Sequence, residues 1–341
     1  MRAGIVPGTY DQGRHPRPAN VRAGPMPPAA PRRDGVLVIE VDELTKRYKD
    51  TAAVRQLSFR VRPGHVTGFL GPNGAGKTTT LRMLLGLVAP TSGTATVDGR
   101  AFRERPRGLR HVGALLDAGD VHGGRSARAH LSALARGNRI PSTRVDEVLE
   151  EVGLSGPAAG RRVDGYSLGM KQRLGIATAL LGDPPVLLFD EPLNGLDPEG
   201  VRWVRGLFRR LAAEGRTVFV SSHLMSEMEH TADQLIVIGR GELIAAESLT
   251  DFAARGTRLT VTVRTPDTGR LAAVLSAEGA AVAPYDERTL KVTALSAARI
   301  GELALHHRIL LEELTPQAAS LEAAFMELTA DSAEFLAGDT R

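Results

Sequence analysis

Residues 71–78 read Gly71-Pro72-Asn73-Gly74-Ala75-Gly76-Lys77-Thr78. The stretch matches the glycine-rich phosphate-binding loop, in which a glycine and four further residues precede Gly-Lys and then Ser or Thr. The apolar run at residues 65–70 predicts a β-strand before the loop, and leucines at helical spacing predict a helix over residues 77–87. Since this order brings backbone N–H groups and a helix N-terminus to one point, the sequence predicts an α/β fold that binds phosphate there.

The residues of this loop have distinct expected roles. The glycines let backbone N–H groups turn toward phosphate oxygens, while the Lys77 ammonium is expected to reach the β- and γ-phosphates and the Thr78 hydroxyl to hold Mg²⁺. The residues expected to bind nucleotide are Gly71, Pro72, Asn73, Gly74, Ala75, Gly76, Lys77, Thr78 and Thr79. A glycine-rich structural turn is the alternative, but a chance match that also has the flanking strand and helix is rare.

A second motif is Pro185-Val186-Leu187-Leu188-Phe189-Asp190-Glu191. Its apolar run is typical of a buried parallel strand, so the two carboxylates emerge at the carboxyl edge of the sheet, where α/β folds bind ligands. We expect Asp190 to hold Mg²⁺ through water and Glu191 to orient or deprotonate the attacking water. An ordinary strand end explains Asp-Glu taken alone, but together with the upstream loop the pair is a strong indication of a nucleotide site. The two motifs do not separate a kinase from a motor or a pump.

Residues 1–35 are rich in Pro, Gly and Arg, and they predict a disordered tail. They hold six arginines and two aspartates, which account for the whole formal net charge of +4. The remaining chain is formally neutral, so no nucleic-acid partner is expected, because binding to the phosphate backbone needs a basic face on the folded domain. A tail attracted to anionic lipid is a competing interpretation.

The body of the chain alternates between predicted strands and helices, which is typical of a parallel sheet. Further strands are predicted at 36–41, 57–61, 186–189, 217–221 and 235–238, and further helices at 126–135, 142–152 and 201–213. The first two of these helices indicate an inserted helical subdomain over about 118–180. Strands at 258–264 and 289–292 and helices at 268–278 and 318–328 predict a small α+β appendage.

The composition limits the possible sites and the position of the chain relative to a membrane. The 341 residues contain no cysteine, which excludes disulfides and thiolate metal sites and fits a reducing cytosol. No apolar run approaches the roughly 18 to 20 residues that a membrane-spanning helix needs. Any membrane pore is therefore expected to belong to another polypeptide.

A third motif is Tyr166-Ser167-Leu168-Gly169-Met170-Lys171-Gln172-Arg173, which opens a predicted helix just upstream of the Asp-Glu strand. Here the sequence resembles the ATP-binding-cassette (ABC) family, whose signature is Leu-Ser-Gly-Gly-Gln. Ser167 and Gly169 match the signature, whereas Tyr166, Leu168 and Met170 depart from it. The resemblance implies that this segment caps the γ-phosphate of ATP held by the opposite subunit. A capped amphipathic helix is the alternative.

Other landmarks of the family follow in order. Asn194-Gly195-Leu196-Asp197 resembles the D-loop, which makes Asp197 a candidate for contact across a dimer. Ser221-Ser222-His223 resembles the switch segment, in which His223 would sense the γ-phosphate rather than lie as an ordinary surface histidine. Tyr48 lies where the family places a ring on adenine, with a partly buried tyrosine at a strand edge as the alternative.

One family landmark is missing in its usual form. At the start of the helical subdomain the family has a glutamine that contacts Mg²⁺ or the attacking water, and in Val112-Gly113-Ala114-Leu115-Leu116-Asp117 that position is Asp117. A carboxylate can meet Mg²⁺ or its water, although it is shorter and negatively charged. The alternative is that Asp117 caps only a helix or loop.

The resemblance implies an α/β P-loop NTPase cassette at residues 36–246, with a RecA-like parallel sheet, an antiparallel β subdomain and the helical subdomain, followed by the appendage at 247–341. It implies a subunit that binds and hydrolyses ATP with Mg²⁺, using Lys77, Glu191 and His223 in catalysis. Two copies would form a homodimer around ATP and drive a separate transmembrane permease from the cytoplasmic, inner face of the membrane.

The end of the chain, at residues 320–328, resembles bacterial drug-resistance exporter ATPases of the daunorubicin and bacitracin type, so export is expected. An importer ATPase is the closer alternative, because substrate choice resides mainly in the permease. A soluble ABC ATPase of ribosomes or DNA is the more distant one. Such proteins usually fuse two cassettes or insert a long coiled coil, and neither feature is present.

Overall fold

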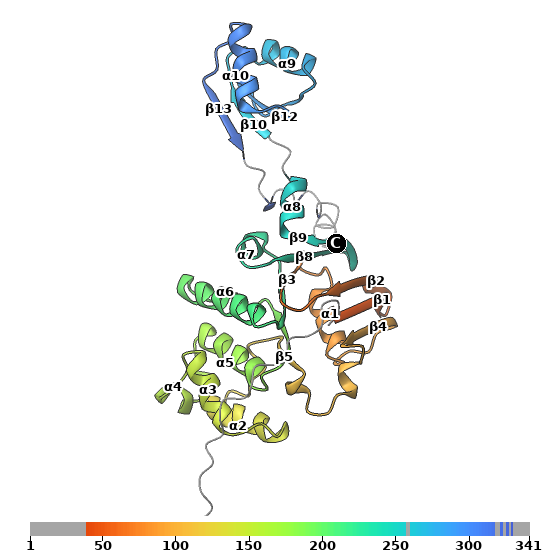
Figure 1. The fold of residues 1–341 in the computed structure, drawn as a ribbon, viewed down its shortest axis with the longest axis vertical. Helices are drawn as coiled ribbons and strands as arrows, with labels where there is room; N and C mark the ends of the chain where they lie inside the picture. The colour runs from red at the N-terminus through yellow and green to blue at the C-terminus, as the bar shows by residue number, and fades with distance from the viewer. Residues whose placement is uncertain (1–38, 257–259, 318–320, 323–324, 327–328, 330–341) are drawn as a thin grey trace, which may run out of the picture. The chain divides into compact units, whose positions relative to one another are not determined.

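The computed structural model in Figure 1 describes residues 39–256, 260–317, 321, 322, 325, 326 and 329. The expected tail at 1–35 and the start of the strand expected at 36–41 lie outside these residues, as does most of the helix expected at 318–328. Within the described ranges, no helix combines the length and the apolar character that crossing a bilayer requires.

A six-stranded sheet forms the centre of the cassette, in the order β5-β6-β7-β3-β8-β9. Its strands are β3 (Val66–Leu70), β5 (Val112–Leu115), β6 (Val186–Asp190), β7 (Thr217–Ser222), β8 (Gln234–Gly239) and β9 (Glu242–Ser248). The first five strands in this order are parallel, and β9 pairs with β8 in the antiparallel sense. β3, β6 and β7 are buried along their whole length, which explains their continuous apolar runs. The predicted parallel sheet is confirmed.

The alternation of side chains along β6 divides the core into two layers. Val186 and Leu188 belong to a cluster with α1 (Lys77–Leu84) and the antiparallel sheet, whereas Leu187 and Phe189 face a cluster with α5 (Leu168–Leu180) and α6 (Pro198–Ala213). Because both faces of the sheet are covered, its carboxyl edge is the place where polar side chains of the central strands reach solvent.

A separate three-stranded antiparallel sheet has the order β2-β1-β4 and is confirmed as a β subdomain. Its strands are β1 (Ile39–Tyr48), β2 (Thr51–Val61) and β4 (Ser92–Val97). β1 and β2 extend well beyond the stretches predicted at 36–41 and 57–61. Register shifts interrupt their pairing, and Glu43 and Gln56 adopt left-handed backbone angles with φ of 45° and 43°. These irregularities break the regular alternation by which a strand is predicted.

The helical subdomain contains α2 (Ala127–Gly137), α3 (Thr143–Glu151), α4 (Pro157–Gly160) and the start of α5. Ser126 caps α2, because its Oγ accepts a hydrogen bond from the backbone N–H of Ala129 at 3.2 Å. Gly153, with φ of 70°, terminates α3 as predicted. The remaining short elements are the 3₁₀ turns η1 (Phe102–Glu104), η2 (Gly108–Arg110) and η3 (Val163–Gly165) and the helix α7 (Met225–Glu229).

The six-stranded sheet extends past the boundary expected at residue 246. β9 ends at Ser248, and the following α8 (Leu249–Gly256) places Phe252 in the same core cluster as α5 and α6. β9 reads Glu-Leu-Ile-Ala-Ala-Glu-Ser, and both Glu242 and Leu243 are exposed. It therefore lacks the alternation of apolar and polar residues by which a strand is predicted.

The appendage begins at β10 and has a core of its own, which includes Val261, Leu271 and Ile300. Its elements are β10 (Thr260–Arg264), α9 (Thr268–Ala277), β11 (Ala281–Pro284), β12 (Thr289–Thr293), α10 (Ala297–His306) and β13 (Glu313–Gln317). All neighbouring strands are antiparallel, in the order β11-β12-β10-β13. This βαββαβ order gives the predicted α+β appendage a ferredoxin-like topology.

Candidate nucleotide site

The phosphate-binding loop lies between the end of β3 and α1, where only glycine fits at two positions. A Cβ atom at Gly71 would lie 2.5 Å from the carbonyl oxygen of Ile238, and one at Gly76 would lie 2.5 Å from that of Ala53. Gly76 also has φ of 103°, a conformation that side chains rarely adopt. The loop is therefore held tightly against β2 and β8.

Lys77 lies inside this loop, with 6% of its surface exposed. Its Nζ donates hydrogen bonds to the carbonyl of Gly71 at 2.7 Å and to that of Pro72 at 3.4 Å, and it lies 3.5 Å from Oε1 of Glu191. Burial lowers the pKa of Lys77, and the carboxylates of Glu191 and Asp190 oppose that shift. The ammonium is thus held by carbonyls and a carboxylate at the position where phosphate oxygens are expected.

Asp190 and Thr78 meet at the expected metal position. The Thr78 hydroxyl donates a hydrogen bond to Oδ2 of Asp190 at 2.6 Å, and the hydroxyl of Ser221 donates to Oδ1 of the same carboxylate. Asp190 is only 7% exposed. A carboxylate and a hydroxyl in contact form a hard oxygen donor set, which suits Mg²⁺, since this ion usually takes few protein ligands and completes its shell with phosphates and water. These residues therefore fit the predicted metal.

Glu191 follows the last residue of β6 in a left-handed backbone conformation, with φ of 47°. Such a conformation costs a non-glycine residue about 1 to 3 kcal/mol and persists only where surrounding contacts enforce it. The Glu191 N–H donates to Oγ of Ser221 at 3.0 Å, and its carbonyl accepts from Nε2 of Gln172 at 3.0 Å. Gln172 and Ser221 were not predicted as site residues, because a contact between distant segments leaves no local pattern in the sequence.

His223 lies beside the carboxylate of Glu191. Its Nδ1 is 2.9 Å from Oε2 of Glu191, and its side chain is 33% exposed. Behind it, the Ser222 hydroxyl donates to Oε2 of Glu227 at 2.5 Å. Burial raises the pKa of Glu227, the Ser222 hydrogen bond opposes this shift, and the charge of Glu191 adds to it. The structure therefore brings Lys77, Glu191 and His223 together as predicted and adds Glu227 to the neighbourhood.

The signature segment is both a helix cap and an exposed surface. Oγ of Ser167 accepts from the N–H of Met170 at 3.3 Å, so it caps α5, yet Ser167 is exposed and Gly169 is half-buried. Leu168, 57% exposed, packs over Gly195 so closely that a Cβ there would lie 2.1 Å from Cδ2 of Leu168. The predicted D-loop thus adjoins the signature segment. Its Asp197 caps α6 by accepting from the N–H of Gly200 at 2.8 Å.

Two further predicted residues lie at the ends of strands. Tyr48 ends β1 with 48% of its surface exposed, and Nζ of Lys46 lies 5.0 Å from the centre of its ring. About half of the surface of Tyr48 is thus open, and Lys46 lies over one face of its ring. Asp117 follows β5 and is exposed, and its Oδ1 accepts from the N–H of Gly119 at 2.6 Å. This contact is the loop cap that the sequence analysis gives as the alternative role of Asp117.

Comparison with known proteins agrees with the nucleotide site described above. The profile of the family described as "ABC transporter" matches residues 54–194, and a "Domain of unknown function (DUF8746)" matches residues 259–322. The chain is 42% identical over 217 residues to the uncharacterized ABC transporter ATP-binding protein YhcH of Bacillus subtilis, covering 63% of this chain and 71% of that protein. It is 44% identical over 210 residues to the bacitracin transport ATP-binding protein BcrA of Bacillus licheniformis, covering 61% and 68%.

The likeness to one relative also includes the appendage. The uncharacterized ABC transporter ATP-binding protein YcbN of Bacillus subtilis is 35% identical over 298 residues, which cover 85% of this chain and 96% of that protein. Among solved structures, "Structure of ATP binding subunit of ABC transporter" matches with a TM-score of 0.59 at 25% identity, covering 64% of this chain and 92% of the other. The predicted cassette fold is confirmed, and the chain belongs to the ABC transporter family, as an ATP-binding subunit that carries the family's ATP-hydrolysing cassette.

Proposed function

We propose that this chain powers export through a separate membrane-spanning permease by hydrolysing ATP between two copies of itself. The observation that carries the proposal is the position of Glu191, whose carboxylate lies within 3.5 Å of Lys77 and within 2.9 Å of His223. A carboxylate between a buried ammonium and an imidazole is suited to accept a proton from water beside a phosphate group. Export is supported by relatives named for bacitracin transport, lantibiotic transport and Nod factor export.

The residues divide the work of hydrolysis. Nζ of Lys77 lies 3.5 Å from Oε1 of Glu191, and the β- and γ-phosphates of ATP would compete with this carboxylate for the ammonium. Glu191 is then free to take a proton from the attacking water, while His223 donates a hydrogen bond to the γ-phosphate. Mg²⁺, which Thr78 and Asp190 would hold, supplies positive charge beside the phosphate oxygens when it is bound. Tyr48 stacks on adenine.

The second copy supplies the signature segment that completes each ATP site. Ser167 and Gly169 lie at the exposed N-terminus of the thirteen-residue helix α5, whose unpaired N–H groups suit the γ-phosphate held by the partner copy. Asp197, next to the signature segment in space, would contact the partner at the same interface. Closure of this dimer pulls on the permease, which places the chain on the inner face of the membrane.

The composite site is tested by mixing two inactive variants, Lys77→Ala and Ser167→Arg. In the mixed dimer, ATP on the Ser167→Arg chain meets the intact Ser167 of the Lys77→Ala chain, so one complete site remains. ATPase activity should therefore reappear on mixing, with the permease present if the isolated chain dimerises weakly. The matched control carries both substitutions on one chain. Mixed with wild-type chain it leaves no complete site in the heterodimer, and the wild-type activity should fall in proportion to heterodimer formed.

Direction of transport needs a separate measurement. A host strain that lacks the chain should lose tolerance to at least one member of a panel of peptide antibiotics that includes bacitracin. Wild-type chain should restore tolerance, and the Glu191→Gln chain should not. Unchanged tolerance across the panel, together with reduced uptake of a nutrient, would assign the chain to import instead.

A further inference from the structure

Gln172 connects the signature helix to the predicted catalytic carboxylate. Its side chain is 5% exposed, and its Nε2 donates to the main-chain carbonyl of Glu191 at 3.0 Å. Gln172 lies on α5, the helix that Ser167 caps, whereas Glu191 follows β6. One buried amide thus joins the element proposed to serve the partner's ATP to the residue that acts on the chain's own ATP.

The hydrogen bond from Gln172 is made to a residue, Glu191, whose backbone conformation is strained. Glu191 has φ of 47°, and the two peptide groups beside it are held by different partners. Oγ of Ser221 holds the N–H, while the carbonyl accepts from Gln172 at 3.0 Å and, at the longer distance of 3.3 Å, from the N–H of Asn194. A left-handed non-glycine residue relaxes toward ordinary angles when such contacts are lost. Rotation of the Glu191 peptide would turn its carboxylate away from His223, since the side chain leaves the backbone at the rotated residue.

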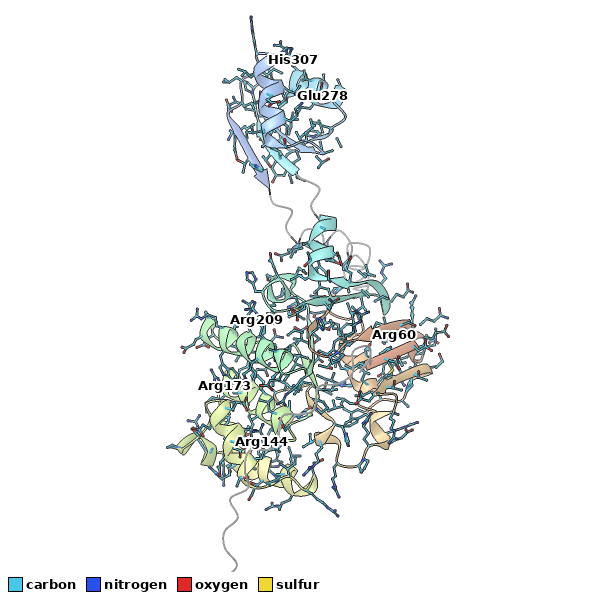
Figure 2. All side chains as sticks on the ribbon, viewed as in Figure 1. Arg60, Arg144, Arg173, Arg209, Glu278 and His307 are labelled. Atoms are coloured by element: carbon cyan, nitrogen blue, oxygen red, sulfur yellow. The ribbon has the colours of Figure 1, made fainter. Side chains whose placement is uncertain are left out.

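The contact is not needed to hold α5 in place. The neighbouring Arg173, labelled in Figure 2, donates to the carbonyl of Val152 at 2.9 Å and lies over the ring of Trp203 at 4.5 Å. The apolar side of α5 is also buried in the main core cluster, through residues such as Leu174 and Ile176. The helix therefore has its own anchors, and the Gln172 amide is directed at Glu191 alone among the hydrogen bonds described for it.

We propose that Gln172 is a positioning residue for Glu191, through which the helix that faces the partner's ATP also fixes the carboxylate that acts on the chain's own ATP. The inference rests on the proposed two-copy site. It predicts a defect in turnover rather than in nucleotide binding, and a defect confined to the site whose Glu191 lies on the altered chain.

The first measurement uses Gln172→Met, which keeps the approximate volume of the side chain and removes its donor. In the homodimer, kcat should fall on the order of tenfold, while KM for ATP stays within about threefold. The matched control is Thr178→Val, which removes a hydroxyl on the same helix that donates to the carbonyl of Leu174 at 3.0 Å. This control should leave kcat within about twofold of wild type.

The second measurement places Gln172→Met on either chain of the mixed Lys77→Ala and Ser167→Arg dimer. On the Ser167→Arg chain it lies beside the working Glu191, and the restored activity should fall on the order of tenfold. On the Lys77→Ala chain it lies beside an idle Glu191 but on the helix that presents the working Ser167. There the activity should stay within about twofold.

The outcomes separate the possible roles. A loss only on the Lys77→Ala chain would mean that Gln172 supports the signature segment, and equal losses on both chains would mean that it stabilises the fold; either result overturns the proposal, as does no loss on either chain. A mixed dimer that is inactive before Gln172 is changed contradicts the composite site instead. In that case the homodimer decides, because an increase in KM with unchanged kcat would exclude positioning of Glu191.

Discussion

Nδ1 of His223 lies 2.9 Å from Oε2 of Glu191, although the two residues follow different strands. β6 and β7 are hydrogen-bonded neighbours in which Asp190 pairs with Ser221, so the residues that follow them emerge side by side at the carboxyl edge. The same Glu191 carboxylate lies 3.5 Å from Nζ of Lys77. One carboxylate therefore lies between the phosphate-binding loop and the switch segment. Substitution of Glu191 and substitution of its partner Lys77 should impair ATP hydrolysis in different ways.

Lys77→Ala and Glu191→Gln should produce different defects. The first removes the charge that holds the phosphates, and it should weaken ATP binding by about 10- to 100-fold and abolish turnover. The second keeps the shape of the side chain but removes the base, so ATP affinity should stay within about threefold while turnover falls by about 100-fold or more. Equilibrium titration with ATP and a phosphate-release assay measure the two quantities. Poor ATP binding by Glu191→Gln with normal hydrolysis would contradict the role given to Glu191.

Asp117 is expected to act as a loop cap, because its Oδ1 accepts from the N–H of Gly119. Asp117→Asn keeps this acceptor and removes the charge, so turnover should stay within about twofold of wild type. Asp117→Ala loses the contact, and it should cost about 1 kcal/mol, which corresponds to about 2 to 4 °C in Tm. A tenfold or larger loss of turnover in Asp117→Asn at unchanged Tm would instead assign the carboxylate to Mg²⁺ or its water.

Glu227 should make the stability of the nucleotide-free protein depend on pH. Burial raises its pKa, so between the ordinary and the raised value the folded chain binds more protons than the unfolded chain. Stability from this group is therefore lost as pH rises through that window. Glu227→Gln removes the titration, and its Tm relative to wild type should increase from about pH 4 to about pH 8.

The control for this pH dependence is Glu229→Gln, which changes an exposed carboxylate on the same helix. The difference in Tm between this variant and wild type should vary little with pH. If Glu229→Gln and Glu227→Gln responded alike, the dependence would reflect the net charge of the chain rather than burial of Glu227.

The sequence predicts those parts of the fold that have a strong local pattern. β3, β6, β7 and β8 were predicted because strands buried on both faces are continuous apolar runs. β5 and β9 were not, since β5 has only four residues, including Gly113, and β9 mixes glutamates with alanines. Strands at the edge of a sheet depend on pairing with a neighbour, which a local pattern does not show.

The same limit applies to the site. Lys77, Asp190, Glu191 and His223 stand in recognisable motifs, and the structure brings them to one edge of the sheet. Gln172 lies inside the signature motif, but its proposed role depends on a hydrogen bond to the main-chain carbonyl of Glu191. Every residue has such a carbonyl, so the sequence does not show which one a side chain contacts. The feature that distinguishes Glu227 is its burial. The sequence of a short helix does not indicate whether a glutamate within it is buried.

The last prediction concerns Ser167, which caps α5 within its own chain and is proposed to serve ATP on the other. Glu191→Gln with ATP should accumulate the closed two-copy dimer, because binding is kept and hydrolysis is blocked, and size-exclusion chromatography should show it. Adding Ser167→Arg places a large cation where the γ-phosphate of the partner's ATP would meet the helix N-terminus, so the dimer should be lost. Ser126→Arg is the matched control, since Ser126 caps α2 in the same way, through the N–H of Ala129. That variant should lower Tm through loss of its cap but keep the dimer. If the dimer formed equally well with Ser167→Arg, the signature segment would be only a capped helix.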